Sequence, residues 1–369
     1  MGERIIVLGG GVIGLASALE LNNRGHQVTV LEKSKCGGQA SGAAAGMLAP
    51  FSEIGEDPDD FFQLCLASLR LYPTWQKEVK RLSNRGFEYI NSGSLHAVYH
   101  EADLLALETR QSWQKDWGTE ANILTAGELK QKEPELSDNI IAAMHYPEES
   151  HVFAPDYVRA LEEACRNQGV TICDELEHVS VLEWRGDIKL QSMDGRIFTS
   201  EKLVICSGAW AQELEETFSL RIPVYPIRGQ ICAYDNLQGR VNHIVYTSQG
   251  YLVPKGNGTI VNGASEDIAG FATDVTEKGI LRLTNWNYQI FPFLKEMKPF
   301  HRWAGLRPAT QDGYPLIGSL EEAPHVIMAT GHYRNGILLS PVTAVSVANI
   351  VDGLAEHVPL NLFKPERFS

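Results

Sequence analysis

The chain has 369 residues, of which 44% are hydrophobic and 21% are charged, and its formal net charge at pH 7 is −14. This length favours two domains, and the hydrophobic share is ordinary for an enzyme with a packed core. The negative charge argues against nucleic acid as a partner, because phosphate binding requires a cationic surface. No run approaches the ~20 apolar residues of a membrane span, and the first apolar run begins too early for a signal peptide. We therefore expect a cytoplasmic protein with no membrane partner.

The cysteines contain no C-x-x-C pair and no metal-ligand spacing, and several fall in apolar patterns. This usage is typical of free thiols in a reducing compartment and predicts neither a disulfide nor a metal site. The six residues are Cys36, Cys65, Cys165, Cys173, Cys206 and Cys232.

The chain opens on RIIVLGGGVIGLASALELNNRGHQVTVLE, residues 4–32. A continuous apolar run predicts a buried parallel strand, an apolar helical segment follows, and a second strand comes after it. Between the first strand and the helix, Gly9, Gly11 and Gly14 form G-x-G-x-x-G. The first glycine permits a tight turn, the second lets the backbone approach a pyrophosphate, and the third lets helix and strand pack closely.

Two further features of this opening favour a bound dinucleotide. The helix N-terminus at Val12 and Ile13 offers free N–H groups and a partial positive charge to phosphates. Glu32 ends the second strand, where a carboxylate can accept hydrogen bonds from ribose hydroxyls. The same carboxylate would repel a 2′-phosphate, which argues against NADP.

The remaining pattern gives a coarse order of elements. FEYINSGSLHAVY alternates like a pair of strands around Ser92 and Gly93. Apolar periodicity predicts helices at about 61–82, after Pro155, and at 340–352 with a start near Gly336. It predicts strands at about 170–173, 178–184, 187–191, 202–206 and across 222–265.

Three later stretches bear on which dinucleotide is bound. GGQASGAAAGMLAP (37–50) is almost free of large side chains, so its backbone and the Ser41 hydroxyl can lie against a flat or charged ligand. KLVICSGAW (202–210) is a buried strand that ends at a Ser-Gly pair just before Trp210. VIMATGHYRNGILLSPVTA (326–344) is a strand, a glycine turn and a second helix N-terminus. A nicotinamide domain would place such pieces in series, whereas here they are scattered along the chain.

This arrangement resembles the FAD-dependent amine and amino-acid oxidases, the family that includes glycine oxidase, sarcosine oxidase and D-amino-acid oxidase. The resemblance covers essentially the whole chain, and its most specific parts are the opening fingerprint, SGAAAGML, WAGLRP and GHYRNGILLSP. Within the family, the chain resembles the glycine oxidases of bacterial thiamine biosynthesis. The implied α/β fold has a discontinuous Rossmann-like FAD-binding domain and a substrate-binding domain with a mixed or antiparallel sheet and helices. Their expected ranges are 1–50, 145–215 and 306–369 for the first and 51–144 and 216–305 for the second.

The resemblance also implies which residues hold FAD, and it implies a homo-oligomer, with a tetramer as the expected form. Backbone at Val179 would contact the adenine, and the segment from His332 would run beside the flavin. His332 by itself is typical of a structural histidine. The other expected cofactor-binding residues are Gly9, Gly11, Val12, Ile13, Gly14, Glu32, Ser41, Ala44, Ala45, Gly46, Met47, Ser207, Gly208, Trp210, Arg334, Asn335, Gly336, Ile337 and Leu338.

Sarcosine oxidases tether FAD through a cysteine in the loop that matches LRPATQDG. No cysteine follows Cys232 in this chain, so we expect FAD to be bound non-covalently.

An amino-acid substrate presents a carboxylate, and the planar fork of arginine binds a carboxylate bidentately. Arg307 is the first candidate, since its apolar neighbours in WAGLRPAT indicate partial burial and a buried arginine needs an anion. Tyr251 in YLVP is the second, and Arg334 would support the carboxylate or the reduced flavin. By resemblance Met47, Ala49 and Glu266 line the pocket, and Glu266 stands where an apolar residue is expected. An acid there would bond the substrate amine or discourage a second carboxylate.

Three activities remain open from the sequence. The first is an oxidase that passes electrons to O2, giving H2O2 and a 2-oxo acid from glycine, sarcosine or small D-amino acids. The second is an FAD-dependent D-amino-acid dehydrogenase that reduces a quinone or a protein acceptor, and the absence of a basic amphipathic anchor favours the first. The third is a protein with a structural flavin, which an arginine at the pocket argues against. Because FAD carries the difficult chemistry, we expect side chains to position the substrate and no dedicated catalytic residue.

Overall fold

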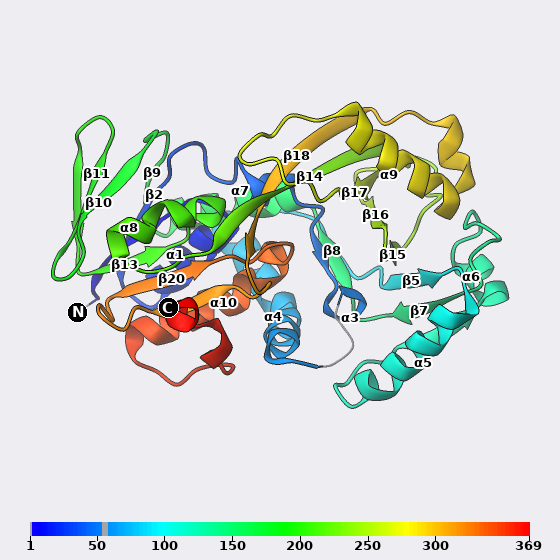
Figure 1. The fold of residues 1–369 in the computed structure, drawn as a ribbon, viewed down its shortest axis with the longest axis horizontal. Coiled ribbons are helices and arrows are strands. Elements are labelled where there is room, and N and C mark those ends of the chain that lie inside the picture. The colour runs from blue at the N-terminus through cyan, green and yellow to red at the C-terminus, as the bar shows by residue number, and fades with distance from the viewer. Residues whose placement is uncertain (1, 54–57) are drawn as a thin grey trace.

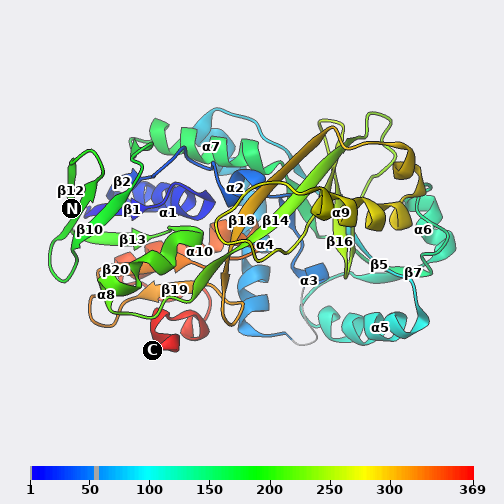
Figure 2. The same cartoon turned by 45° about the horizontal axis from the view of Figure 1, so that its top comes forward.

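Two large β-sheets lie side by side and divide the chain between them, with helices packed on each (Figures 1 and 2). The structure is a computed structural model that describes residues 2–53 and 58–369. Both sheets take strands from distant parts of the chain, so the polypeptide crosses between them several times. This mixed α/β architecture confirms the predicted fold class.

The first sheet has six strands in the order β19-β20-β13-β1-β2-β9. All neighbouring pairs are parallel except β19 and β20, which are antiparallel. The strands come from four separate stretches of sequence, so this sheet is discontinuous along the chain, as the predicted fold class requires. Their bounds are β1 Arg4–Leu8, β2 Gln27–Leu31, β9 Thr171–Cys173, β13 Lys202–Ile205, β19 Leu316–Ser319 and β20 Val326–Thr330.

The two faces of this sheet are covered differently because successive strand residues point to opposite sides. In β1, Ile5 and Val7 pack against the helical side, whereas Ile6 and Leu8 pack toward a small antiparallel sheet. That small sheet contains β10 Val179–Glu183, β11 Ile188–Ser192 and β12 Ile197–Ser200. The helical side contains α1 Val12–Asn23, α4 Asp60–Ser83, α7 Ala154–Asn167 and α10 Gly336–Asp352, which pack against one another.

Helix α1 is buried on nearly every side, which explains why its sequence shows no polar face. Helix α4 is amphipathic and is defined at both ends by local chemistry. At its start the side chain of Asp59 accepts a hydrogen bond from the backbone N–H of Phe62 at 2.7 Å, and at its end Asn84 adopts a left-handed conformation.

The second sheet has eight strands in the order β18-β14-β17-β16-β15-β5-β7-β6. Its pairs are antiparallel apart from β15 and β5, so the sheet is mixed, as predicted. The strand bounds are β5 Ser94–Val98, β6 Asn122–Thr125, β7 Ala142–Tyr146, β14 Val224–Asp235, β15 Ile244–Thr247, β16 Gly250–Lys255, β17 Thr259–Gly263 and β18 His301–Thr310. The helices on it are α5 Glu101–Lys115, α6 Ala126–Lys132 and α9 Glu277–Ile290.

Strands β14 and β18 form a long antiparallel pair that reaches from the second sheet toward the first (Figures 1 and 2). The pair runs in unbroken register from Val224 opposite Thr310 to Ala233 opposite His301. Residues on this ribbon are therefore held rigidly between the two sheets.

One prediction about strand pairing is wrong. Strands β4 Tyr89–Ile90 and β5 do not pair with each other across Ser92 and Gly93. Instead β4 pairs with β8 Ser150–Val152, in a small sheet that also contains β3 Met47–Leu48, and β5 joins β7 and β15. Gly93 has a φ of +70° at the bend, so the chain turns from one sheet into another at the point where the alternation suggested a hairpin.

The shorter helices complete the description. They are α2 Ala40–Ala43, α3 Pro50–Glu53 and α8 Glu215–Phe218, with 3-10 segments at Gly208–Leu214, Pro292–Glu296, Asn361–Phe363 and Pro365–Phe368. Among the described residues, none of the helices combines the length and the apolar composition that crossing a bilayer requires.

A buried carboxyl ties α3 to the second sheet. Glu149 is fully buried, accepts a hydrogen bond from the backbone N–H of Ser52 at 2.8 Å and contacts the hydroxyls of Ser52 and Ser94. Burial raises the pKa of Glu149 to about 7 despite these donors.

We predict that Glu149 makes stability depend on pH near neutrality. Its pKa in the folded chain is above the ordinary value, so its stabilising contribution is present at low pH and is lost as pH rises through about 7. The difference in melting temperature, Glu149→Gln minus wild type, should be more positive at pH 8 than at pH 5. The corresponding change in the free energy of unfolding is at most about 3 kcal/mol. Thermal melts of both proteins at the two pH values, with Glu277→Gln as the surface control, measure this. An equal difference at both pH values would contradict the prediction.

Candidate active site

A cavity of about 340 Å³ lies where the two sheets meet. It is bordered by the carboxyl ends of β1, β2, β13 and β20, the edge at which parallel sheets bind ligands. The β14–β18 ribbon closes its other side through residues of both strands.

Most residues that the sequence predicted for cofactor binding line this one cavity, although they are scattered through the chain. The lining includes Gly9, Gly11, Val12, Ile13, Glu32, Ser41, Ala44, Ala45, Gly46, Met47, Val179, Ser207, Gly208, Trp210, His332, Arg334, Asn335, Gly336 and Ile337. Of the predicted substrate-binding residues, Arg307, Tyr251, Arg334, Met47 and Ala49 line it as well.

Three predicted residues do not line the cavity, and each has a physical reason. Gly14 lies beneath the turn, where an added Cβ would be 1.9 Å from the carbonyl oxygen of Gly9, so its role is close packing. Leu338 is one helical step too far along α10, and its side chain is buried in the core. Glu266 lies against the guanidinium of Arg334, with half of its side chain exposed.

The glycine turn and the small-residue segment meet at the start of α1. Ser41 Oγ accepts a hydrogen bond from the backbone N–H of Val12 at 3.0 Å. The segment that follows β2 is thereby fixed beside the helix N-terminus, where partial positive charge gathers. This end of the cavity suits the phosphates of a dinucleotide.

Glu32 is held by two backbone donors at the end of β2. Its carboxylate accepts hydrogen bonds from the N–H of Gly10 at 2.7 Å and from the N–H of Ser34 at 2.9 Å. The carboxylate therefore has a fixed orientation at the cavity wall and keeps lone pairs for further donors such as ribose hydroxyls.

Ser207 supplies a direct test of whether a polar ligand fits here. Its Oγ is buried and has no hydrogen-bond partner among the described residues, although Ser207 lines the cavity. Buried hydroxyls are almost always hydrogen-bonded in native proteins, so a ligand atom or solvent is needed to complete this one. The glycine turn, the fixed Glu32 and this orphaned hydroxyl together fit a bound dinucleotide.

Arg307 lies on β18, lines the cavity and faces strand β14. Its Nη1 donates to the carbonyl oxygen of Ser265 at 2.9 Å. The space for its guanidinium exists because residue 229 on β14 is glycine, where an added Cβ would be only 2.5 Å from the guanidinium carbon. Glycine in the interior of a strand marks such a close approach, a signal that the sequence analysis missed.

Tyr251 on β16 lies beside this arginine and is 6% exposed. Burial raises the pKa of Tyr251, while the guanidinium groups of Arg307 and Arg334 oppose the rise. The phenol therefore keeps its proton at neutral pH and can donate it to a carboxylate that Arg307 binds.

Arg334 and His332 come from the segment that precedes α10. Arg334 lies between Glu53 and Glu266, at 3.4 Å from each carboxylate, and the charge of Glu53 raises the pKa of Arg334. His332 is 3% exposed, its Nε2 lies 3.0 Å from Thr343 Oγ1, and burial lowers its pKa to about 3. His332 is thus a neutral, hydrogen-bonded histidine, as its sequence context suggested.

Sequence reasoning missed several lining residues that come from other segments. Lys33 Nζ lies 3.3 Å from the centre of the Trp210 ring, which is a cation–π contact. The position of Lys33 directly after Glu32 is the sequence signal that could have placed it at the site. Others include Gln39, Glu53, His178, Ser180, Glu213, Gly229 and Tyr333.

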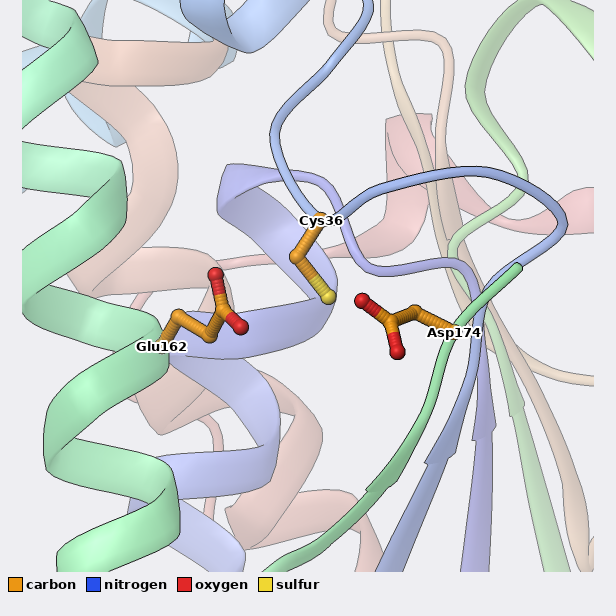
Figure 3. Close-up of side chains that lie close together, drawn as sticks. All are labelled: Cys36, Glu162 and Asp174. Atoms are coloured by element: carbon orange, nitrogen blue, oxygen red, sulfur yellow. The ribbon is translucent and has the colours of Figure 1, made fainter.

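Cys36, Glu162 and Asp174 lie together beside the glycine turn, with their possible ligand atoms within 4.8 Å of one another (Figure 3). Glu162 already accepts hydrogen bonds from Arg166 at 2.8 and 3.1 Å. Burial and the nearby carboxylates raise the pKa of the Cys36 thiol to about 12. Because the Glu162 carboxylate is already paired with Arg166, we assign no metal site to this cluster.

Fold and cavity together fit a protein that binds a dinucleotide at the carboxyl edge of a parallel sheet. The family described as "DAO: FAD dependent oxidoreductase" matches residues 4–350. The chain therefore belongs to this family of FAD-dependent oxidoreductases.

Several relatives of known name match nearly the whole length of this chain. A glycine oxidase from Geobacillus kaustophilus is 32% identical over 352 residues, which are 94% of this chain and 92% of that protein. The crystal structure of glycine oxidase from that organism aligns with a TM-score of 0.93 and covers 99% of both chains. The bifunctional protein ThiO/ThiG of Trichormus variabilis is 32% identical over 99% of this chain and 56% of its own length. An iminodiacetate oxidase from Chelativorans sp. BNC1 is 27% identical, with a TM-score of 0.90 over 98% of this chain and 99% of that one.

We predict that Glu32→Ala weakens FAD binding about 10- to 150-fold, because a hydrogen bond to a charged group contributes about 1.5–3 kcal/mol. Glu201→Ala is the matched control, since Glu201 also accepts a backbone N–H at 2.7 Å but lies away from the cavity. Titration of the apoproteins with FAD, followed by flavin fluorescence, gives both dissociation constants. Equal constants for Glu32→Ala and wild type would show that Glu32 does not contact the ribose.

Proposed function

We propose that this chain catalyses oxidative deamination of glycine and of other small amino acids or amines, such as sarcosine and small D-amino acids. FAD supplies the hydride acceptor when bound, and O2 is the final oxidant, so that H2O2 is released. Hydrolysis of the imine gives a 2-oxo acid and ammonia, and glycine gives glyoxylate. The names of the glycine oxidase and ThiO/ThiG relatives support a further proposal, that the imine supplies thiazole formation in thiamine biosynthesis.

One observation carries this proposal: Arg307 presents a guanidinium at the cavity wall and makes no ion pair with any residue the structure describes. A partly buried cation without an anion is unfavourable, so the site is built for an anionic ligand. Tyr251 lies beside it as a second donor, which suits the two oxygens of a carboxylate.

The surrounding residues bear on how the substrate is held. Met47 lines the cavity and packs against the cluster that contains Tyr251, and Ala49 lines the cavity as well. His332 stays neutral and faces Thr343, so it does not take up the substrate proton at working pH. The protein thus binds, orients and desolvates the amino acid, and the substrate has to enter as the neutral amine.

We further propose that FAD is bound non-covalently. Cys206 is the one cysteine that lines the cavity among the described residues, and burial raises the pKa of its thiol far above the ordinary value. It lies beside the glycine turn, where Gly14 approaches its Cβ, rather than at the Arg307 end. Acid precipitation of the holoenzyme should therefore leave FAD in the supernatant.

The domain division is also a proposal. We propose FAD-binding residues 1–50, 145–215 and 306–369 and substrate-binding residues 51–144 and 216–305. Strands β7 and β18 of the second sheet cross the boundaries at 144 and 305, and α4 packs on α7 and α10. We place α4 with the FAD-binding part for this reason. A homotetramer remains our proposal from the family resemblance, and light scattering of the purified enzyme measures the oligomeric state.

The function is tested by mixing the purified holoenzyme with glycine without oxygen. We expect the flavin absorbance to bleach, and on admission of air we expect it to return with release of H2O2 and glyoxylate. Acetate, which has the carboxylate and lacks the amine, is the control and should leave the flavin oxidised. A flavin that stays reduced in air and is reoxidised by a quinone analogue would instead identify a dehydrogenase. Simple amines that outperform glycine would contradict the carboxylate anchor.

Removal of Arg307 tests the anchor itself. Arg307→Ala should raise the glycine concentration needed for half-maximal flavin reduction by the equivalent of about 2–5 kcal/mol, because one partner of a desolvated charge pair is lost. Arg307→Lys should recover only part of this, since an ammonium cannot form the planar fork. Arg302→Ala on the same strand is the control, because Arg302 pairs with Glu277 at the surface. Steady-state kinetics decide the matter, and equal effects of Arg302→Ala and Arg307→Ala would refute the assignment.

A further inference from the structure

The cavity contains two arginines, and the structure treats them differently. Arg307 donates to a neutral carbonyl, that of Ser265, and has no acidic partner among the described residues. Arg334 directs Nη2 toward Glu53 and Nη1 toward Glu266, each at 3.4 Å. One guanidinium is therefore available to an anionic ligand, whereas the other already has two carboxylates.

A single short segment accounts for both partners. Ser265 contacts Arg307 through its carbonyl, and the next residue, Glu266, contacts Arg334 through its carboxylate. The backbone on either side of Glu266 is fixed on strand β14, because Ser265 N–H donates to Gln230 O at 3.2 Å and Asp267 N–H donates to Arg228 O at 2.9 Å. The Glu266 carboxylate is thus delivered to the cavity edge by an anchored loop.

The charges around Arg334 determine how strongly a second carboxylate of a substrate could bind there. Two carboxylates around one guanidinium leave a formal charge of −1, and the Glu53 side chain is only 14% exposed. A carboxylate tethered beside its partner competes as though it were present at a concentration on the order of millimolar. A second carboxylate on the substrate therefore has to displace Glu266 and also faces repulsion from Glu53.

We propose that Glu266 is a specificity-determining residue that, together with Glu53, occupies Arg334 and restricts the enzyme to amino acids with one carboxylate. The inference rests on the proposed function for the identity of the reaction, and it concerns this residue's effect on substrate choice. Glu266 acts through Arg334, so its effect should disappear when Arg334 no longer carries a charge.

The probe is iminodiacetate, an amine with a carboxymethyl group on each side, compared with glycine. Glu266→Gln keeps the size of the side chain and removes its charge. Calorimetric titration of the holoenzyme after chemical reduction of its flavin, kept anaerobic so that bound iminodiacetate cannot be oxidised, should give iminodiacetate binding at least tenfold tighter in Glu266→Gln than in wild type. Stopped-flow flavin reduction should show the ratio of kcat/KM for iminodiacetate to that for glycine rising by a similar factor. Glu135→Gln is the matched control, because Glu135 forms a half-exposed pair with Arg240 away from the cavity.

The double variant Glu266→Gln/Arg334→Gln separates this mechanism from a general loss of negative charge. We expect the gain for iminodiacetate to disappear in the double variant. A gain that persists without Arg334, or an unchanged iminodiacetate affinity in Glu266→Gln, would overturn the inference. If glycine reduces the flavin in no variant while iminodiacetate binding still tightens in Glu266→Gln, the proposed reaction fails and the role of Glu266 stands.

Discussion

An unpaired guanidinium between two sheets is the constraint on which the cavity depends. Arg307 has to remain charged, partly buried and without an acidic partner among the described residues, which is unfavourable in the absence of a ligand. The β14–β18 ribbon makes this possible, because its unbroken register fixes the arginine and glycine at position 229 leaves the space for it. A binding site of this kind lowers the free energy of unfolding when it is empty, because only a bound anion pairs with the guanidinium.

Several other charged groups of the cavity have partners within the protein. Arg334 lies between two carboxylates, Glu32 accepts two backbone N–H groups, and Lys33 lies over the ring of Trp210. His332 is kept neutral by burial. In the described chain, Arg307 has no acidic partner and the hydroxyl of Ser207 has no hydrogen-bond partner. The Arg307 guanidinium suits a carboxylate, whereas the Ser207 hydroxyl suits a dinucleotide.

Much of the fold was predictable because it depends on local patterns. The buried strand, glycine turn and helix at the N-terminus follow from apolar runs and from the close approach of Gly14 to Gly9, and the structure has them at 4–8 and 12–23. The strand pairing around Gly93 was not predictable in this way. Alternation shows that a segment is extended and half buried, whereas the choice of partner depends on which distant strands lie alongside.

The site divides in the same way. Residues of the fingerprint and of the segment before α10 are recognisable one by one, and the structure brings most of them to one cavity. Sequence patterns could not predict that Glu53, Glu266 and Arg334 lie together, because these residues are more than 60 positions apart. They meet only through the packing of α3, the loop after β17 and the turn before α10. Glu266 drew notice as an acid where an apolar residue was expected, but its partner could not be named without the fold.

The central claim is that the Arg307 guanidinium binds the substrate carboxylate, and the most direct test is a crystal structure of the holoenzyme with glycolate. Glycolate keeps the carboxylate of glycine and replaces the amine with a hydroxyl. We predict that both carboxylate oxygens bind the Arg307 guanidinium, with the Tyr251 hydroxyl in contact and the ion pairs of Arg334 intact. A glycolate carboxylate bound to Arg334 instead, with Arg307 facing only the carbonyl of Ser265, would contradict it.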